Sequence, residues 1–477
     1  MRVLFATSEA TPFVKTGGLA DVCGELPICL AKKGVDVSVV LPLYSSIPQK
    51  FRKDFEFVKH FDIYLGNGKQ YAGIFKYIYK GVTFYFIDNE KYFARPNVYG
   101  YDDEGERFAF YDFAFIELIS HLQLRPDIVH CNDWQTGMIP VLYHEHYKNF
   151  EYYQDIKFIM TVHNPAYQGN YPPEILDKLF MMNFDLYENG KLRFNNCLSY
   201  LKAGLVYADR ITTVSRTYKN DLCSFEGGYG LQSIFSYRYK DFYGIVNGID
   251  YEQNNPKTDP DIFYQYDRRN INNKKKNKVE FQKKYGLPVD ENIPLIAMVS
   301  RLTWQKGLDI FFGSIERILE KNVQLLVVGS GDYEYEQRLS YLQTKYPNKM
   351  YVFIGYQASL AKLAYAASDY FLMPSLFEPC GISQLIALRY GSLPIVREVG
   401  GLIDTVTAYN EYTKEGTGFS FKNYSSDELY NTVNYALSFY NTDDYKLLVK
   451  NAMGQDFSWE KSTLEYIALY KSLETIK

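Results

Sequence analysis

The chain is poor in cysteine, and the cysteines that it has are badly spaced for cross-links. Six occur among 477 residues, scattered and without a CxxC pair. This spacing argues against a disulfide framework or a zinc knuckle and is typical of a reducing compartment. No window reaches the ~18 apolar residues of a membrane span. The sequence also does not begin with the basic segment followed by an apolar one that is typical of a targeting signal. We therefore expect a cytoplasmic protein without a membrane partner.

Histidine is also scarce, with six residues in the whole chain. His144 and His146 stand two apart in a predicted helix, so their side chains point to different faces. No cluster of histidines and carboxylates has the spacing of metal ligands. We expect no metal site and no cofactor.

The chain also has no large excess of charge of one sign. Lys and Arg number 52 against 56 Asp and Glu, which gives a net charge of -4 and excludes a broad nucleic-acid-binding surface. One basic cluster, residues 268–278, has no aromatic side chains between its charges. We expect it to be a solvated loop and helix start.

What the chain does have is a regular alternation of short apolar runs with helix-period segments. This pattern predicts an α/β protein whose parallel sheets are covered by helices on both faces. The alternation restarts after a polar stretch, residues 251–278, and so predicts two Rossmann-like domains facing a central cleft. Two closely spaced alternating runs suggest a hairpin near residues 70–88. We expect domains at 1–246 and 247–456, with a C-terminal helix in 457–477 that packs back towards the first domain.

Sheets of this kind bind ligands at the carboxyl ends of their strands. The first predicted strand is followed by Lys15, Gly17 and Gly18, with Asp21 in the helix that comes next. Paired glycines let a ligand approach the backbone, and a helix N-terminus offers N–H groups to an anion. The stretch matches neither GxxxxGK[ST] nor GxGxxG, so a tight turn with a surface lysine stays open as an alternative.

Other strand ends of the first half carry polar and aromatic side chains. Asp133 and Trp134 follow one predicted strand, and His163 and Asn164 follow the next. Asn247 lies in a third strand-end segment. We expect these residues at one edge of the first sheet, although a histidine that ends a buried strand is often simply a hydrogen-bonded core residue.

The second half places cations at a strand end. Arg301 and Lys306 follow a predicted strand and precede a helix, an arrangement that suits a diphosphate. Tyr356 ends another strand, where its ring could stack on a base. Further along, Glu378 stands beside the backbone N–H groups of a predicted helix start, a pairing that can orient sugar hydroxyls. That start comprises Cys380, Gly381 and Ile382. Cys380 has no histidine partner in this motif, which makes it a poor nucleophile candidate.

Taken together and in order, these motifs resemble those of bacterial-type glycogen synthases and the closely similar starch synthases. The resemblance covers essentially the whole chain and rests on KTGGLADV, VHCNDWQTG, TVHNPAYQG, ITTVS, VNGID, VSRLTWQKGLD, GSGD and PSLFEPCGISQLIALRYG. It implies a B-type glycosyltransferase fold. It also implies transfer of glucose from ADP-glucose to the non-reducing 4-hydroxyl of an α-1,4-glucan (glycogen, starch or a maltooligosaccharide), with retention of configuration and without a metal. A plant or algal member would work in the plastid stroma.

The resemblance also implies a role for each candidate residue. The donor diphosphate would be bound by Lys15, Gly17, Gly18, Arg301 and Lys306, and Asp21 is a further substrate-binding candidate. The glucosyl group would be held by His163, Asn164, Glu378, Cys380, Gly381 and Ile382, with the His163 carbonyl near the anomeric carbon. Adenine would stack on Tyr356, and Asn247 would sit between the donor and the cleft. The acceptor side would be shaped by Asp133 and Trp134, with Tyr99 as a further acceptor candidate. The residues with catalytic roles among these would be His163, Glu378, Arg301, Lys306 and Asp133.

One position departs from the wider fold class. Many B-type transferases carry a second glutamate eight residues after the first, and here that position is Ile386, with Gln384 nearby. This leaves ribose recognition unassigned. A related transferase that uses UDP-glucose or another acceptor, a phosphorylase of similar fold, and a catalytically silent glucan-binding protein remain alternatives.

Overall fold

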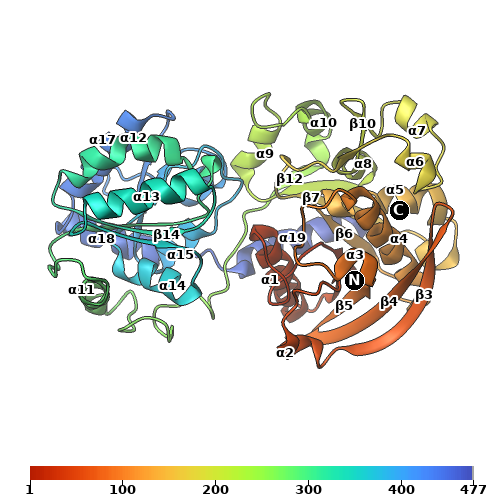
Figure 1. Cartoon of the computed structure of the whole chain (residues 1–477), viewed down its shortest axis with the longest axis horizontal. Helices are drawn as coiled ribbons and strands as arrows, with labels where there is room; N and C mark the ends of the chain where they lie inside the picture. The colour runs from red at the N-terminus through yellow and green to blue at the C-terminus, as the bar shows by residue number, and fades with distance from the viewer. Residues whose placement is uncertain (475–477) are drawn as a thin grey trace. The chain divides into compact units, whose positions relative to one another are not determined.

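The computed structural model describes residues 1–474, which form two compact units (Figure 1). Unit 1 comprises Met1–Ile245 together with helix α19 (Trp459–Glu474), and unit 2 comprises Val246–Ser458. The chain thus leaves unit 1, builds unit 2 and returns to unit 1 for its last helix. Within residues 1–474, no helix is long and apolar enough to cross a membrane.

Unit 1 is built on a mainly parallel sheet that has nine strands in the described part of the chain. Its parallel strands are, in spatial order, β12 (Phe242–Gly244), β11 (Arg210–Thr213), β7 (Lys157–Val162), β6 (Ile128–Asn132), β1 (Arg2–Ala6), β2 (Asp36–Pro42) and β5 (Val82–Asp88). The sheet then continues with the antiparallel strands β4 (Gly68–Tyr79) and β3 (Glu56–Leu65). The pairing of β4 with β5 confirms the expected hairpin, whereas β3 was not foreseen.

The central strands of this sheet are fully buried, as a strand covered on both faces must be. Each residue of β6 is buried, and so are four of the five residues of β1. A small sheet pairs β8 (Asn170–Tyr171), β10 (Cys197–Ser199) and β9 (Arg193–Phe194). The helices of unit 1 are α1 (Gly18–Lys32), α2 (Gln49–Arg52), α3 (Glu90–Phe93), α4 (Glu104–His121), α5 (Ile139–Leu142), α6 (Ile175–Lys178), α7 (Asp185–Glu188), α8 (Tyr200–Tyr207), α9 (Arg216–Leu222), α10 (Gln232–Tyr237) and α19, with the short helices η1 (Trp134–Thr136), η2 (Tyr143–Tyr147), η3 (Glu151–Tyr153) and η4 (Tyr239–Asp241).

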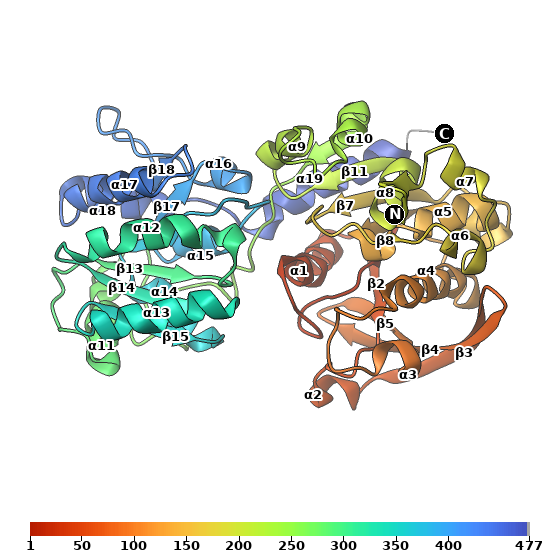
Figure 2. The ribbon, with the colours of Figure 1, turned by 45° about the horizontal axis from the view of Figure 1, so that its top comes forward.

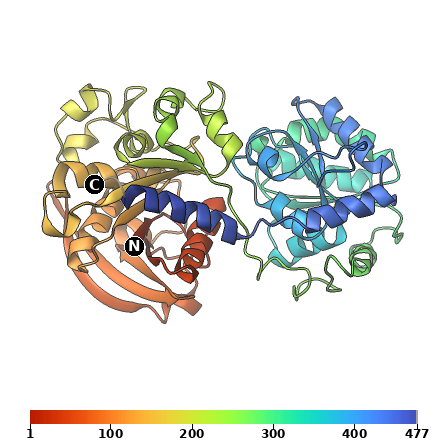
Figure 3. The ribbon, with the colours of Figure 1, turned by 180° about the vertical axis from the view of Figure 1, so that it is seen from behind.

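The C-terminal helix α19 belongs to the core of unit 1. It packs along α1, and the two helices run side by side in Figure 3, α19 in blue and α1 in red. Lys33 at the end of α1 pairs with Glu460 at 2.5 Å, and Arg216 pairs with Glu465 at 3.1 Å. The indole N–H of Trp459 donates to the Glu25 carboxylate.

Unit 2 is built on an all-parallel sheet, six-stranded in the described residues and flanked by helices on both sides (Figure 2). The strand order is β15 (Met350–Ile354), β14 (Gln324–Gly329), β13 (Leu295–Val299), β16 (Tyr370–Met373), β17 (Leu393–Arg397) and β18 (Phe419–Phe421). The helices are α11 (Asn272–Tyr285), α12 (Leu308–Leu319), α13 (Tyr333–Lys345), α14 (Ala358–Ala367), α15 (Ser383–Arg389), α16 (Gly401–Thr405), α17 (Ser426–Ser438) and α18 (Asp443–Met453), with the short helix η5 (Trp304–Lys306). Helix α12 packs on α17, α14 on α11 and α15 on α18.

The basic cluster at 268–278 differs from its prediction, because two of its lysines are buried. Lys274 donates from Nζ to the carbonyls of Tyr365 and Ala366, at 3.0 and 3.1 Å. These carbonyls belong to the last turn of α14, where carbonyl groups have no hydrogen-bond donors within the helix itself. Burial lowers the pKa of Lys274 to about 7. The sequence could not reveal this docking, because the partner carbonyls lie some 90 residues away along the chain.

The second buried lysine forms an ion pair in the core of unit 2. Lys278, 1% exposed, places Nζ 2.9 Å from Oδ2 of Asp369 and 3.0 Å from the Ile293 carbonyl. Asp369 also accepts the backbone N–H of Leu295 at 2.8 Å. Because Leu295 begins β13, this pair ties α11 to the central strands of the sheet.

We predict that Asp369→Ala lowers the free energy of unfolding of unit 2 by about 3–5 kcal/mol, since it leaves the Lys278 ammonium buried without its counter-ion. The matched control is Asp427→Ala, whose pair with Arg317 lies at the surface with 76% of the Asp427 side chain exposed. That control should cost less than about 1 kcal/mol. Scanning calorimetry of the two variants makes the comparison, and equal losses would contradict the prediction.

Candidate active site

The candidate residues of unit 1 gather at the carboxyl ends of three neighbouring strands. Strands β1, β6 and β7 lie side by side in the sheet, and the chain leaves them at Ala6, Asn132 and Val162. In a parallel sheet these ends share one edge. The structure therefore brings together segments 7–18, 133–134 and 163–164, which the sequence places up to 157 positions apart.

Asp133 anchors the end of β7 through its side chain. Its Oδ1 accepts the backbone N–H of His163 at 2.7 Å and that of Asn164 at 3.4 Å. Its own backbone N–H donates to the Thr161 carbonyl at 2.9 Å, and its φ is +56°. Burial raises the pKa of the Asp133 carboxyl to about 7. Asp133 thus fixes the turn that carries His163 and Asn164, at the cost of a strained backbone.

The ring of His163 is held by a hydrogen bond to the side-chain amide of Asn132. Asn132 donates from Nδ2 to the carbonyls of Ala6 and His130, both at 3.2 Å, which leaves its Oδ1 as an acceptor. His163 Nε2 lies 3.0 Å from that Oδ1 and must carry the proton. Burial lowers the pKa of His163 to about 3, so the ring is neutral and Nδ1 is unprotonated. His163 is therefore both a hydrogen-bonded core histidine and a residue of the site.

The glycine-rich loop is held by a buried carboxylate that the sequence did not single out. Glu9, 3% exposed, accepts from the backbone N–H of Thr16 and, at 2.9 Å, from its hydroxyl. The hydroxyl of Tyr99 lies 3.3 Å from Glu9 and 2.7 Å from that of Ser8. Burial raises the pKa of Glu9. The structure thus joins Tyr99 to the loop, and Glu9 could have been found from its position just after β1.

At the loop's end, Lys15 and Asp21 form an ion pair of 2.7 Å at the start of α1. Burial raises the pKa of Asp21, and the Lys15 ammonium opposes this shift. Gly17 precedes the helix, and a Cβ there would meet no atom within 4 Å. Packing within the chain therefore does not require glycine at this position, whereas close approach of a ligand would. Gly18 is the first residue of α1 and is exposed.

Trp134 lies in an aromatic cluster instead of standing free at the edge. Its ring is 6% exposed and packs edge-on against Phe108, with centroids 5.0 Å apart. Tyr171 and Tyr200 lie at 5.9 and 6.3 Å. Gly169 lies so close that a Cβ would come within 2.3 Å of the indole.

In unit 2 the cation and the acid predicted for the site form one ion pair. Nζ of Lys306 lies 2.6 Å from Oε2 of Glu378, and the Ser375 hydroxyl donates to the same oxygen at 3.2 Å. Both charged side chains are largely buried, with 17% and 8% exposed. Because β13 and β16 are neighbours, the segments that follow them meet here. Arg301 follows β13 as well and is exposed.

Backbone contacts hold together the segments that follow β13 and β16. The Gln305 carbonyl accepts the N–H groups of Leu376 and Phe377, at 3.0 and 3.3 Å. Gly307 has a φ of +73°, and a Cβ there would come within 2.0 Å of the Pro374 carbonyl. Only glycine allows this approach.

The segment after Glu378 is organised by a glutamine. Gln384 donates from Nε2 to the carbonyls of Cys380 and Gly381, at 2.9 and 3.0 Å, and to Thr405 Oγ1 at 3.1 Å. Ile382 directly precedes helix α15. Burial raises the pKa of the Cys380 thiol to about 12, which argues against a nucleophilic role.

Two further candidate ligand contacts, Asn247 and Tyr356, lie in unit 2. Asn247 comes just after β12, which ends at Gly244. There its backbone N–H faces the Cys380 thiol, and its buried Oδ1 has no hydrogen-bond partner within residues 1–474. Tyr356 is 76% exposed, as a stacking platform must be.

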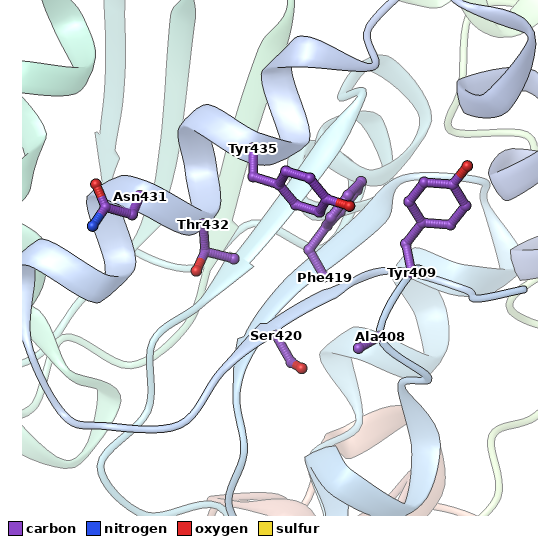
Figure 4. Close-up of a pocket in the computed structure, with 7 residues that line it drawn as sticks. All are labelled: Ala408, Tyr409, Phe419, Ser420, Asn431, Thr432 and Tyr435. Carbon is purple, nitrogen blue, oxygen red and sulfur yellow. The ribbon is translucent and has the colours of Figure 1, made fainter. Parts of the chain in front are cut away.

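A separate hollow in unit 2 lies between the edge strand β18 and helix α17 (Figure 4). It is lined by Ala408, Tyr409, Phe419, Ser420, Asn431, Thr432 and Tyr435. None of the residues proposed from the sequence lines it. Within the described residues, no group of three or more His, Cys, Asp or Glu side chains is arranged to hold a metal ion.

Comparison with known proteins matches this geometry to one family. The starch synthase catalytic domain model matches residues 2–237, and the model for glycosyl transferases group 1 matches residues 278–453. Glycogen synthase of Clostridium beijerinckii is 50% identical over 475 residues, 99% of each chain. Glycogen synthase of Lactobacillus acidophilus is 47% identical over 99% of this chain and 100% of its own. The chain belongs to the glycogen synthase family.

Solved structures agree with the assignment to glycogen synthases. The catalytic domain of starch synthase IV from Arabidopsis thaliana, bound to ADP and acarbose, superposes with a TM-score of 0.92. It is 30% identical, and the match covers 99% of both chains. Sucrose-phosphate synthase from Thermosynechococcus elongatus, at 16% identity and a TM-score of 0.62 over the full length of both chains, shares the fold. The predicted family, transferase class and α/β fold of two Rossmann-like domains are thus confirmed.

We predict that the stability of the protein depends on pH through Asp133. Its pKa is about 7 in the folded chain against an ordinary 3.8, so between these values the folded state keeps a proton that the unfolded chain has lost. Its contribution to stability therefore falls as pH rises through this window. Asp133→Asn cannot titrate, so its melting temperature relative to wild type should rise from pH 5 to 8.

The control for the Asp133 test is Asp54→Asn on the exposed surface of unit 1. Its melting temperature should differ from wild type by the same amount at every pH. A constant difference for Asp133→Asn as well would show that Asp133 does not titrate in this range.

Proposed function

We propose that the protein transfers glucose from ADP-glucose to the 4-hydroxyl at the non-reducing end of an α-1,4-glucan, with retention of configuration. The observation that carries this proposal is the buried Lys306–Glu378 pair at the edge of the unit 2 sheet. It sets a fixed cation beside a carboxylate, the two groups that a sugar diphosphate requires. The ADP bound to the Arabidopsis starch synthase supports the choice of nucleotide.

The leaving group is the part of the donor that most needs stabilisation. Lys306 and the exposed Arg301 both follow β13, where they would neutralise the charge that gathers on the diphosphate as it departs. Lys15 and the open backbone at Gly17 would serve the diphosphate from unit 1. With this much fixed positive charge we propose that the reaction needs no metal ion.

The glucosyl group would be held by neutral contacts and one acid. Glu378 and the backbone N–H groups of Cys380 and Gly381 would orient its hydroxyls, with the His163 carbonyl and the Asn164 side chain near the anomeric carbon. Adenine would stack on Tyr356, and Asn247 would offer its unpaired Oδ1. Asp133, Trp134 and Tyr99 would shape the acceptor side, with Trp134 acting from within its aromatic cluster.

We propose front-face attack through an ion-pair-like state. The bond from the anomeric carbon to the diphosphate oxygen breaks, and its electron pair leaves with ADP. The acceptor 4-hydroxyl oxygen then bonds to the same face of that carbon and gives its proton to the departing phosphate. Double displacement would need a free carboxylate under the sugar. Asp133 is occupied by backbone N–H groups and Glu378 by Lys306.

The cellular partners follow from the same chemistry. We propose glycogen, starch or a maltooligosaccharide as the acceptor and the cytoplasm as the location, or the plastid stroma for a plant or algal chain. Use of UDP-glucose or of another acceptor is the main rival. A phosphorylase would require a pyridoxal phosphate site, and a catalytically silent glucan-binding protein would release no ADP.

The test is incorporation of labelled glucose into glycogen from ADP-glucose and, in parallel, from UDP-glucose, with and without a chelator. We expect faster incorporation from ADP-glucose and no effect of the chelator. Lys306→Ala should lower turnover by about 10²-fold, as for loss of a preorganised charge at the transition state. Lys321→Ala, an exposed lysine of the same unit, should not. Faster transfer from UDP-glucose, loss of activity with chelator, or no transfer at all would each contradict the proposal.

A further inference from the structure

A buried row of polar side chains lies beneath the Asn132–His163 contact. The Tyr470 hydroxyl lies 2.8 Å from His130 Nδ1, and His130 Nε2 lies 2.6 Å from Thr161 Oγ1. Thr161 Oγ1 in turn lies 2.5 Å from Thr212 Oγ1. Each of these four residues is at most 1% exposed. We call them the polar row.

The polar row lies one step below the site on the same face of the sheet. His130 comes two residues before Asn132 on β6, and Thr161 comes two residues before His163. Side chains two apart on a strand point to the same face. Asn132 is in register with Thr161, which is in register with Thr212. The row is thus joined to the site through the backbone of β6 and β7, and Asn132 Nδ2 donates to the His130 carbonyl at 3.2 Å.

Burying polar side chains is energetically unfavourable in this part of the core, which is otherwise aromatic. The His130 ring packs against Phe5, with centroids 4.5 Å apart, and against Tyr466 at 5.7 Å. Burial lowers the pKa of His130 to about 3, so its ring is neutral and carries a single N–H. Both ring nitrogens contact hydroxyls, so one hydroxyl donates to the ring and the other accepts from it. Each member of the row has a hydrogen-bond partner within it, and a buried polar network whose members are all satisfied is rigid.

One end of the polar row comes from the C-terminal helix. Tyr470 is the only member outside the sheet, and α19 enters unit 1 directly after Ser458, the last residue of unit 2. If the Tyr470 hydroxyl were removed while the helix stayed in place, the His130 Nδ1 atom would lose its partner in a buried position. An unpaired buried group costs about 1–3 kcal/mol, and the cost falls on the strand that carries Asn132.

We propose that Tyr470 and His130 are positioning residues for glucosyl transfer, through which the docked C-terminal helix holds Asn132 and His163 in place. The kinetic part of this inference rests on the proposed function, whereas the structural part does not. Tyr470 and His130 touch no substrate and act through the ends of β6 and β7.

The first test is the kinetics of Tyr470→Phe, which keeps the ring and removes only the hydroxyl. We expect kcat to fall by about 10-fold, as for a small displacement of a reacting group. We also expect KM for ADP-glucose to change by less than about 2-fold, because the diphosphate contacts of unit 2 are untouched. The matched control is Tyr153→Phe, which removes another buried hydroxyl of unit 1, bonded to the Ile116 carbonyl at 2.9 Å. It should leave kcat unchanged.

The second test reads the ring nitrogens of the histidines by NMR after labelling with ¹⁵N-histidine. The chain has six histidines, so the spectrum is simple, and His130→Gln and His163→Gln assign the two signals of interest. Tyr470→Phe should shift the nitrogens of both His130 and His163, whereas Tyr153→Phe should shift neither. A loss of stability alone would not move the His163 signals of the folded protein.

The outcomes separate the two claims. A lower kcat with shifted His163 nitrogens in Tyr470→Phe alone supports the positioning role. Unchanged His163 nitrogens overturn it whatever the kinetics show, and so does an equal loss of kcat in Tyr153→Phe. If the wild-type protein transfers no glucose, the proposed function fails, and the positioning role is then judged on the His163 nitrogens alone.

Discussion

The ion pair between Lys306 and Glu378 is the interaction on which the rest of the site depends. It joins the segments that follow β13 and β16, and it does so at 2.6 Å with both side chains largely buried. Removing either partner of such a pair leaves an uncompensated charge, which costs about 3–5 kcal/mol. Glu378 therefore holds Lys306 in place without a ligand, and the ammonium is already oriented when a diphosphate arrives. Preorganised charge of this kind needs no rearrangement during the reaction.

The two units manage their charged groups in different ways. In unit 2 two buried ammonium groups are paired with carboxylates, Lys306 with Glu378 and Lys278 with Asp369. At the edge of the unit 1 sheet, burial raises the pKa of Asp133 and lowers that of His163, which favours the neutral form of each. A neutral His163 with Nε2–H given to Asn132 can offer its carbonyl and Nδ1 but cannot act as a cationic acid. In the proposed chemistry, unit 2 supplies the buried Lys306 ammonium, and the strand ends of unit 1 that carry Asp133 and His163 position polar groups.

Much of this arrangement could be predicted from the sequence, because strand-end geometry is a general rule. Asp133, His163 and Lys306 each follow an apolar run, and parallel sheets bring such positions to one edge. The predictions failed where a partner is remote in sequence. Lys274 and Lys278 look like solvated charges until the carbonyls of α14 and the carboxylate of Asp369 are seen beside them.

The contacts that orient the site residues were the least predictable. Glu9 and Tyr470 lie outside the quoted motifs, and the motifs that contain Asn132, His130, Thr161 and Thr212 do not show what these residues contact. Each makes its bonds to groups that only the folded chain brings close. Periodicity identifies His130 as a buried strand residue, and no pattern in the sequence connects it to Tyr470, 340 positions away. Local sequence thus predicts which residues reach the edge of a sheet, whereas the tertiary fold decides which of them are held still.

The central claim, that Lys306 is a preorganised cation for the terminal phosphate of the donor nucleotide, is tested most directly by titration calorimetry with ADP and AMP. AMP lacks the β-phosphate and serves as the internal control. The account predicts that Lys306→Ala weakens ADP binding by about 10-fold or more, the usual scale for a charge-assisted contact, and leaves AMP binding nearly unchanged. Equal losses for the two nucleotides, or no loss for either, would contradict it.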